Sequence, residues 1–374
     1  MNFCLLTSSY PQSPEESVNA GVFVREFALE LHKRGHRVTI FTPAKAREIA
    51  PDDGIEVHAF PWLGKELVLT RLEPRRPADA LRLLHLWWAG VREIRRWGPE
   101  RSFDRLLAFW AIPSGWFGLQ LHRKTGVPLD VWALGSDIWR RKRYPFGDRV
   151  VKRILSEADN VFADGTGLAQ EAQTLAGRPV RLLRSLRRLP PAEAAPDLAP
   201  DSCHFVFVGR WDSVKGLDVF VEAFLGLEDL PCQAHIFGEG QQAGWLTARL
   251  QSVRGGRVHV HGTVPPKELA AYLKASDFAV ISSRQESLPV FFSDAMQAGL
   301  PVIASDVGDL RGLIEKHQVG IVVPPNDVPA LSQALRQAYA AKKSRWEAAC
   351  RKLGSALDPA RMVDEYLAIV SPKK

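Results

Sequence analysis

Short apolar segments that alternate with amphipathic segments constrain the fold of this chain more than any other feature. The segment 21–35, for example, has apolar residues at helical spacing and ends at Gly35, which is typical of a helix end. Strands that alternate with helices form parallel sheets with helices on both faces. We therefore predict an α/β chain with doubly wound parallel sheets. The apolar runs that we interpret as strands are residues 3–8, 37–43, 54–61, 106–111, 129–135, 160–164, 204–209, 233–238, 257–262, 278–283, 300–306 and 320–324.

The alternation is interrupted at residues 185–202, where the sequence SLRRLPPAEAAPDLAPDS is rich in proline and alanine. We interpret this segment as a linker. A chain of 374 residues is too long for one hydrophobic core and suits two domains. We predict two Rossmann-like domains, residues 1–190 and 191–357, that face each other across a cleft. Ligands of such sheets bind outside the carboxyl ends of the strands, so the loops that follow strands should carry the site.

The composition argues against a membrane-spanning, secreted or metal-binding protein. No apolar run approaches the ~20 residues that a spanning helix needs. The N-terminus lacks a basic region, and its apolar run is too short for a signal peptide. The four cysteines are far apart, which indicates reduced thiols in a cytoplasmic protein. The ten histidines show no HExxH motif and no close pair that would suggest a metal site, so we expect none.

Positive charge is concentrated in one part of the chain. The net charge is +7, but Lys65–Arg153 has 19 Lys and Arg against 9 Asp and Glu, a net charge of +10, together with seven tryptophans. Basic residues mixed with tryptophan suit an anionic membrane face, a nucleic acid or an anionic substrate. Residues 75–98 combine helical spacing, tryptophans and arginines, and 140–146 begin with four adjacent cations. We expect docking on the cytoplasmic face of a membrane. The alternative is that Trp87 and Trp88 lie in the core, while the arginines are solvated or bind a soluble anionic acceptor.

The segment VGRWDSVKGLDVF (208–220) joins a predicted strand to a predicted helix. Gly209 ends the strand and Gly216 precedes the helix. Arg210 and Lys215 lie on either side of the short loop between them. Two cations beside a helix N-terminus suit a diphosphate, because arginine grips oxygens in a bidentate fork and lysine supplies a point charge. The alternative is a loop with two solvated cations.

Two carboxylates flank a predicted helix start in the segment SRQESLPVFFSDAMQAGLP. Glu286 follows a predicted strand, and Asp294 lies over a turn into the helix that Pro289 opens. The amides around Leu288 and Val290 would attract an anion. Glu286 can accept hydrogen bonds from sugar hydroxyls and Asp294 from a ribose, so the spacing matches a ligand laid out as sugar, diphosphate and ribose. The alternative is an ordinary carboxylate pair around an amphipathic helix.

These motifs, taken together, resemble the family-4 retaining glycosyltransferases of the GT-B fold over residues 204–335. The family usually has a glutamate where Asp294 stands, and Asn-Gly-Val-Asp where RSLRRLP (184–190) stands. The matching motifs are GR-x4-KG at Gly209–Gly216, FGEG at Phe237–Gly240, HG-x-V at His261–Val264, E-x7-D at Glu286–Asp294, AGLPVIASDVGDLRGLI at 298–314 and GIVVPPND at 320–327.

The first half of the chain resembles the family more loosely. Residues 7–42 are similar to its opening βαβ unit, in which Gly21 corresponds to a loop glycine near the donor. Residues 103–139 are similar to a second segment of that domain. The resemblance also implies that the C-terminal segment 358–374 crosses back to the first domain, and residues 361–370 have the apolar spacing of a helix that could do so.

Two histidines that are customary in the family are replaced here. Phe109 stands at one of these positions and Leu134 at the other. Ser136 and Asp137 remain as polar candidates near the reaction centre. In a retaining transfer, the departing phosphate can accept the proton of the acceptor hydroxyl, so the replacements are compatible with catalysis.

The resemblance implies an enzyme that moves a sugar from a nucleoside-diphosphate sugar to an acceptor hydroxyl with retention at the anomeric carbon. It implies a glycan or lipid-linked acceptor in bacterial-type cell-surface glycan or glycolipid synthesis, with no metal, no cofactor beyond the donor and no nucleic-acid partner. The catalytic residues that it implies are Arg210, Lys215, Glu286 and Asp137. The donor-binding residues that it implies are Gly21, Gly209, Arg210, Lys215, Val264, Glu286, Leu288, Pro289, Val290 and Asp294.

Two other functions stay open. A non-catalytic GT-B protein that binds a nucleotide or a glycan would explain the replaced histidines, although Arg210, Lys215 and Glu286 argue against it. A nucleotide-sugar epimerase of the same fold is the second alternative, because a fold alone does not define a function.

Overall fold

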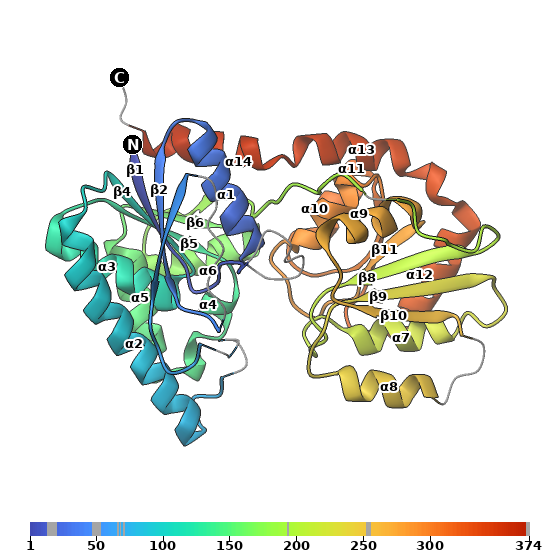
Figure 1. The fold of residues 1–374 in the computed structure, drawn as a ribbon. Coiled ribbons are helices and arrows are strands. Elements are labelled where there is room, and N and C mark those ends of the chain that lie inside the picture. The colour runs from blue at the N-terminus through green and yellow to red at the C-terminus, as the bar shows by residue number, and fades with distance from the viewer. Residues whose placement is uncertain are drawn as a thin grey trace. The chain divides into compact units, whose positions relative to one another are not determined.

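The chain forms two compact units, each built on one parallel sheet. The computed structural model describes residues 1–12, 21–46, 54–65, 67, 69, 72–192, 194–251 and 256–371. Unit 1 is Met1–Ser185 with Met362–Lys374, and unit 2 is Leu186–Arg361. In each unit, helices pack on both faces of the sheet (Figure 1). This arrangement confirms the predicted α/β class with doubly wound parallel sheets.

The sheet of unit 1 has seven strands among the described residues, in the order β3-β2-β1-β4-β5-β6-β7, and all its pairs are parallel. Because helices cover both faces, its inner strands β1, β2, β4, β5 and β6 are buried on both sides along most of their length. The strands are β1 (Asn2–Leu6), β2 (Arg37–Pro43), β3 (Ile55–Phe60), β4 (Arg105–Phe109), β5 (Leu129–Ala133), β6 (Asn160–Ala163) and β7 (Arg181–Leu182). The helices are α1 (Val22–Lys33), α2 (Pro77–Trp97), α3 (Trp116–Thr125), α4 (Ser136–Trp139), α5 (Gly147–Glu157) and α6 (Thr166–Ala176).

The sheet of unit 2 has six parallel strands in the part of the chain that the structure describes, in the order β10-β9-β8-β11-β12-β13. Its strands are β8 (Cys203–Val208), β9 (Cys232–Phe237), β10 (Val258–Gly262), β11 (Phe278–Ile281), β12 (Val302–Ser305) and β13 (Gly320–Val323). Its helices are α7 (Leu217–Leu225), α8 (Ala243–Gln251), α9 (Pro266–Ala275), α10 (Val290–Gln297), α11 (Leu310–His317), α12 (Val328–Ala341) and α13 (Glu347–Ala356).

The strand order of unit 2 changes direction at β8. The chain adds β9 and β10 on one side of β8 and then continues with β11 on the other side. The loops that follow β8 and β11 therefore lie next to each other, at the topological switch point where doubly wound sheets bind their ligands. Arg210 and Lys215 are in the first of these loops, and Glu286 is in the second.

Every apolar run that we interpreted as a strand overlaps one, whereas the short edge strand β7 was not predicted. Strand β7 has only two residues, both exposed, so it lacks the apolar pattern on which the prediction depends. The first unit ends at Ser185, and residues 186–202 of the predicted linker are part of unit 2.

The last helix, α14 (Pro359–Val370), packs on the core of unit 1. The ring of Tyr366 lies 5.3 Å from that of Phe27 and 5.5 Å from that of Phe162. Its hydroxyl donates to Asp130 Oδ2 over 2.8 Å, and Arg105 Nη1 donates to Asp130 Oδ1 over 2.9 Å. Burial raises the pKa of Asp130, and the nearby charge of Arg105 opposes that rise. The charged form of this buried carboxylate is therefore stabilised by its hydrogen-bond donors, one of which comes from the C-terminal helix.

We expect Tyr366→Phe to destabilise the protein by about 1.5–3 kcal/mol, because it removes one hydrogen bond from a fully buried carboxylate and leaves the packing unchanged. Urea unfolding followed by tryptophan fluorescence measures the loss. Tyr339→Phe in α12 is the matched control, since among the described residues no hydrogen bond holds the hydroxyl of this half-buried tyrosine. Equal stability of the two variants would contradict the role assigned to Tyr366.

Candidate functional site

The cation and the carboxylate predicted on neighbouring loops of unit 2 form an ion pair. Lys215 Nζ lies 2.5 Å from Glu286 Oε1, and their side chains are 24% and 12% exposed. The hydroxyl of Ser283 donates to the same Glu286 oxygen over 2.8 Å. The loops after β8 and β11 are thus joined by a charged contact at the switch point. An anionic ligand that bound Lys215 would compete with Glu286 for the ammonium group.

Arg210 opens the loop after β8 and is the more accessible of the two cations. Its Nη2 lies 3.2 Å from Asp212 Oδ2, and its side chain is 42% exposed. Asp212 also accepts a hydrogen bond from the amide of Lys215 over 3.2 Å, which tightens the loop. Arg210 therefore presents a positive charge at the mouth of the site, while Lys215 lies deeper against Glu286.

Glycines allow the backbones of these loops to touch. Gly216 has a φ of +66°, and a Cβ there would lie 2.0 Å from the carbonyl oxygen of Ser282. Gly238 has a φ of +123°, and a Cβ there would lie 1.9 Å from the carbonyl oxygen of Gly209. No side chain fits at such distances, and both backbone conformations favour glycine. Gly216 of the GR-x4-KG motif and Gly238 of the FGEG motif thus have a direct structural cause.

Helix α10 starts at the position predicted from the sequence. Pro289 precedes its first residue, Val290, and Leu288 is buried beside it. The turn at Gly308 packs directly against the residues before this start, since a Cβ there would lie 2.1 Å from the carbonyl oxygen of Ser287, and the amide of Asp309 donates to that oxygen over 3.0 Å. The first amides of a helix have no carbonyl partner within it, so this end favours an anion. It follows the same loop as Glu286.

Asp294, predicted to face a ribose, is paired with a residue that the sequence did not single out. Arg187 Nε lies 3.0 Å from Asp294 Oδ1, and Arg187 Nη2 lies 2.5 Å from Asp294 Oδ2. The side chain of Asp294 is fully buried and that of Arg187 is 11% exposed. Gln297 reinforces the contact, since its amide group donates to the carbonyl of Arg187 and accepts from the amide of Leu189, both over 2.9 Å. Both oxygens of Asp294 are thus engaged by the segment that precedes β8.

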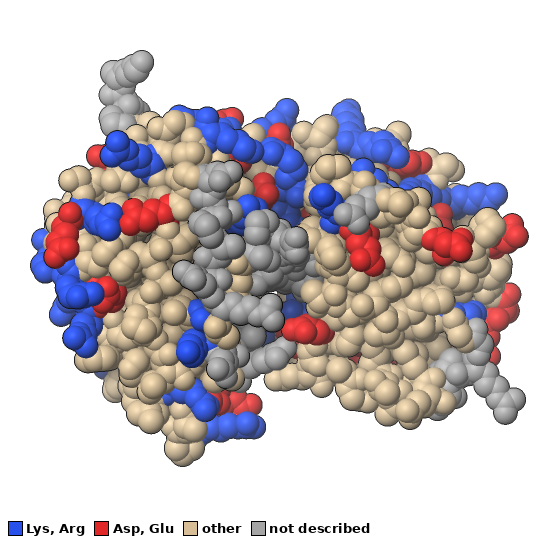
Figure 2. Space-filling view, viewed as in Figure 1, with Lys and Arg blue, Asp and Glu red and all other residues tan. Residues whose placement is uncertain are grey.

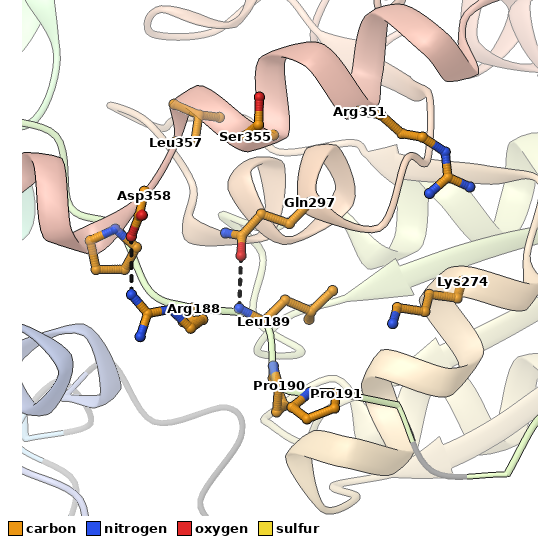
Figure 3. A pocket seen from close by; sticks show the side chains of 12 residues that line it. Arg188, Leu189, Pro190, Pro191, Lys274, Gln297, Arg351, Ser355, Leu357 and Asp358 are labelled. Carbon is orange, nitrogen blue, oxygen red and sulfur yellow. Dashed lines mark hydrogen bonds and ion pairs between the residues drawn. The ribbon is translucent and has the colours of Figure 1, made fainter.

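A pocket of about 420 Å³ lies beside this segment (Figure 3). The bond from Leu189 to Gln297 and the 3.1 Å bond from Arg188 to Asp358 cross one side of it, and Lys274 and Arg351 lie on the other. Its lining, as far as the chain is described, includes neither the two loop cations nor Glu286. We therefore separate this pocket from the candidate site.

In unit 1, the predicted residues Gly21 and Asp137 have clear local roles. A Cβ at Gly21 would lie 2.5 Å from the carbonyl oxygen of Ser9, so glycine lets helix α1 start against the loop after β1. The buried carboxylate of Asp137 accepts hydrogen bonds from the amides of Ala111 (2.6 Å) and Leu134 (3.2 Å). Burial raises the pKa of Asp137 to about 6, and these amides oppose the rise. Asp137 thus holds the ends of β4 and β5 together, and a catalytic contact for it stays a prediction.

Phe109, at a customary histidine position, is fully buried among aromatic side chains. Its ring lies 5.4 Å from that of Trp132 and 5.7 Å from that of Phe27. Leu134, at the other position, is partly buried, and its amide is one of the donors to Asp137. The Phe109 position therefore serves packing in this chain.

Val264, the remaining predicted residue, lies between β10 and α9 and is half-buried.

Histidines that are distant in the sequence meet on adjacent strands of unit 2. His204 Nδ1 lies 3.0 Å from His235 Nε2, and His235 Nδ1 lies 3.1 Å from His261 Nε2. The other nitrogen of His204 lies 2.9 Å from the carbonyl oxygen of Ala199, which can only accept. In the neutral chain, each of the three rings therefore carries its proton on Nε2. No group of three or more His, Cys, Asp or Glu that could hold a metal ion occurs in the described parts of the chain.

We expect the stability of the protein to fall as the pH is lowered from 7 towards 4, partly because of His235. Burial, and to a smaller extent the neighbouring histidines, lower its pKa from 6.5 to about 3. Between these two pH values, His235 is protonated in the unfolded chain and neutral in the folded chain. As the pH falls from the unfolded-state pKa to the folded-state pKa, His235 lowers the free energy of unfolding by up to about 1.4 kcal/mol per pH unit. Urea unfolding at several pH values should give a shallower dependence for His235→Gln than for the wild type. An unchanged slope would rule out His235 as its source.

We expect Arg187→Met to destabilise unit 2 by about 3–5 kcal/mol, because it leaves the buried carboxylate of Asp294 without its counter-charge. The double variant Arg187→Met/Asp294→Asn should regain most of this loss in urea unfolding. Arg188→Met is the matched control. Its pair with Asp358 is 45% and 42% exposed and should contribute less than about 1 kcal/mol. If Arg187→Met and Arg188→Met lost the same free energy of unfolding, the buried pair would stabilise the protein no more than the exposed one.

Comparison with known proteins gives a family for both units. Residues 20–184 match the model described as "Glycosyl transferase 4-like domain", and residues 202–341 match "Glycosyl transferases group 1". The chain is 30% identical over 365 residues to TuaC of Bacillus subtilis (strain 168), a glycosyltransferase whose name refers to teichuronic acid biosynthesis; the match covers 90% of this chain and 88% of that one.

Solved structures share the fold. Sucrose-phosphate synthase from Thermosynechococcus elongatus superposes with a TM-score of 0.78 and 20% identity, over 99% of this chain and 98% of that one. HepE from Anabaena, solved in complex with UDP and glucose, gives a TM-score of 0.73 and 15% identity over the whole of both chains. From its matches in both units and its similarity along nearly the whole length of TuaC, this chain belongs to the family-4 glycosyltransferases and has their GT-B fold.

Proposed function

We propose that this glycosyltransferase uses a nucleoside-diphosphate sugar as its donor and retains the configuration at the anomeric carbon. One observation carries the proposal: Arg210, the Lys215–Glu286 pair and the start of helix α10 lie on neighbouring loops at the switch point of unit 2. This combination provides two cations, free helix amides and a carboxylate within one site. A related fold solved with UDP and glucose supports the same class of donor.

The leaving diphosphate would be bound by Arg210, by Lys215 and by the amides that open α10. These groups stabilise the negative charge that develops as the sugar–phosphate bond breaks. Lys215 would exchange its contact with Glu286 for one with a phosphate oxygen, which releases Glu286 for the hydroxyls of the donor sugar. We propose that this set of donors makes the reaction independent of a metal ion, with no cofactor besides the donor itself.

The ribose of the donor would lie on the side of Asp294. Because Asp294 is fully buried and bound by Arg187, a ribose hydroxyl can reach its carboxylate only if Arg187 moves or shares an oxygen. Val264, after β10, and Gly21, in unit 1, complete the set of residues that we propose for the donor.

Retention needs the acceptor hydroxyl to attack from the face that the diphosphate leaves. The departing phosphate accepts the proton of that hydroxyl, so the reaction requires no side-chain base. Phe109 and Leu134 are compatible with this route because neither position has to move a proton. Asp137 would contribute indirectly, since its two amide contacts fix the loops after β4 and β5.

The acceptor that we propose is a growing cell-surface glycan or a glycolipid at the cytoplasmic face of a membrane. The name of the relative TuaC and the +10 charge of Lys65–Arg153 support this class of acceptor. Among the described residues, no helix combines the length and the apolar character that crossing a bilayer requires. We propose peripheral contact with the membrane and no nucleic-acid partner.

A non-catalytic nucleotide- or glycan-binding protein is the competing function, and the replaced histidine at Phe109 is the observation that favours it. A panel of nucleoside-diphosphate sugars, scored for release of the nucleoside diphosphate with and without acceptor, separates the possibilities. We expect release from one donor, unaffected by EDTA, and a product whose anomeric configuration by NMR matches that of the donor. Binding without release would support the competing function, and conversion of the donor sugar without release would indicate an epimerase.

We expect Arg210→Ala and Glu286→Ala to separate binding from transfer. Arg210→Ala should weaken nucleoside-diphosphate binding about tenfold in calorimetry, since a partly exposed charge-assisted contact is lost. Glu286→Ala should bind the free nucleoside diphosphate normally and lose transfer. Arg336→Ala is the matched control, because Arg336 is 40% exposed and pairs with Asp229 away from these loops. Normal turnover of Glu286→Ala would refute its assigned role, and unchanged affinity of Arg210→Ala would refute the diphosphate site.

A further inference from the structure

Helix α2 of unit 1 has large apolar side chains on its outer face. Leu81, Leu84 and Trp88 are 61%, 69% and 55% exposed. They are spaced by three and four residues, so they share one side of the helix. The opposite side is buried in the core of unit 1. The residues that bury it are Leu86, Ala89, Gly90, Ile94 and Trp97.

The structure divides the two adjacent tryptophans. Trp87 is half-buried, and its ring lies 5.5 Å from that of Trp116, so it packs against unit 1 as the core alternative requires. Trp88 points outward. The alternative that both tryptophans lie in the core therefore holds for Trp87 and not for Trp88, because adjacent helical positions face about 100° apart.

Positively charged side chains lie on the same side of the helix, C-terminal to Trp88. Arg92 and Arg95 follow Trp88 at helical spacing and are exposed, and the guanidinium carbon of Arg92 lies 5.2 Å from the centroid of the Trp88 ring. Arg96 is 72% exposed, although it also pairs with Glu93. Figure 2 shows Lys and Arg side chains along the edge of unit 1 that α2 forms in Figure 1.

The two carboxylates of α2 are turned towards the protein. Asp79 accepts a hydrogen bond from the amide of Glu73 over 3.1 Å and pairs with Arg82. Glu93 is 16% exposed and lies 3.1 Å from His58. The helix thus presents its apolar and cationic groups outward and covers its anionic groups, so an anionic partner would meet little repulsion there.

We propose that this outer face of α2, defined by Leu81, Leu84, Trp88 and Arg92, docks on an anionic lipid bilayer. The proposal names the surface for the membrane contact in the function proposed above, on which it rests. The two leucines would enter the boundary between headgroups and acyl chains. Trp88 would lie at that boundary, and Arg92 would contact lipid phosphates.

A bilayer fits this face better than a folded protein does. Leu81 to Arg95 is a single helical ridge about 20 Å long at ~1.5 Å per residue. A stable protein interface needs about 800 Å² on each side, which one narrow ridge does not supply. A bilayer is deformable, so its headgroups can surround such a ridge, and the negative charge of its phosphates complements the positive charge of the arginines.

Cosedimentation with vesicles tests the proposal. We expect the wild-type protein to bind vesicles of phosphatidylglycerol and phosphatidylcholine in equal parts, to bind less as salt is raised, and to bind pure phosphatidylcholine weakly. Leu84→Gln/Trp88→Gln should lower binding to the anionic vesicles at least about tenfold, because two interfacial apolar groups are lost. Quenching by brominated lipids should be weaker for Trp88→Phe than for the wild type.

The matched control is Val260→Gln, which changes an apolar side chain of unit 2 that is 44% exposed and should leave vesicle binding unchanged. Thermal unfolding of the double variant should equal that of the wild type, since the altered side chains point to solvent. Equal vesicle binding by the double variant and the wild type would overturn the proposal. So would a wild-type dimer, seen in sedimentation, that the double variant breaks, because the face would then bind a second copy of the chain.

Release of the nucleoside diphosphate with a soluble acceptor serves as the independent readout. The double variant should keep wild-type release, since its residues lie outside the site proposed in unit 2. Loss of vesicle binding with normal release supports the proposal. An inactive wild type that still binds vesicles through α2 would overturn the proposed function and leave the docking surface standing.

Discussion

Direct backbone contact between neighbouring loops is the constraint on which the candidate site depends. The turn into α7 touches the loop after β11 at Gly216, and the loop after β9 touches the end of β8 at Gly238. A side chain at either glycine would overlap a carbonyl oxygen, so a substitution would push the loops apart. Lys215 immediately precedes Gly216, and the same contact that needs the glycine brings its ammonium group to Glu286.

The charged side chains in and beside the candidate site form ion pairs with one another. The Lys215–Glu286 pair lies on the strand-end loops, and Arg187–Asp294 joins helix α10 to the segment before β8. A lone buried charge costs far more than a paired one. Pairing therefore stabilises charged groups that a charged ligand could use. In the proposed function, a diphosphate would exchange partners with these groups, since it offers several oxygens to a lysine that loses only one carboxylate.

Most of the fold and part of the site could be predicted from the sequence, because they depend on local patterns. Apolar runs located the buried strands and, at their ends, the loops that carry Arg210, Lys215 and Glu286. The partner of Asp294 could not be predicted, since Arg187 lies in an irregular segment whose path is set by tertiary contacts. The histidines illustrate a second limit. His204, His235 and His261 are far apart in the sequence, and only the register of β8, β9 and β10 brings them together.

Helix α10 connects the candidate site to the segment that begins unit 2. Its start follows the loop of Glu286, whereas Asp294 and Gln297 near its other end bind the segment that begins unit 2. Its middle is buried, and Gly354 of α13 lies so close that a Cβ there would be 2.4 Å from the carbonyl oxygen of Met296. A helix held along its whole length cannot shift at one end alone. The segment from Arg187 to Leu189 therefore fixes the helix start that belongs to the proposed diphosphate site, although it contributes no group to that end of the site.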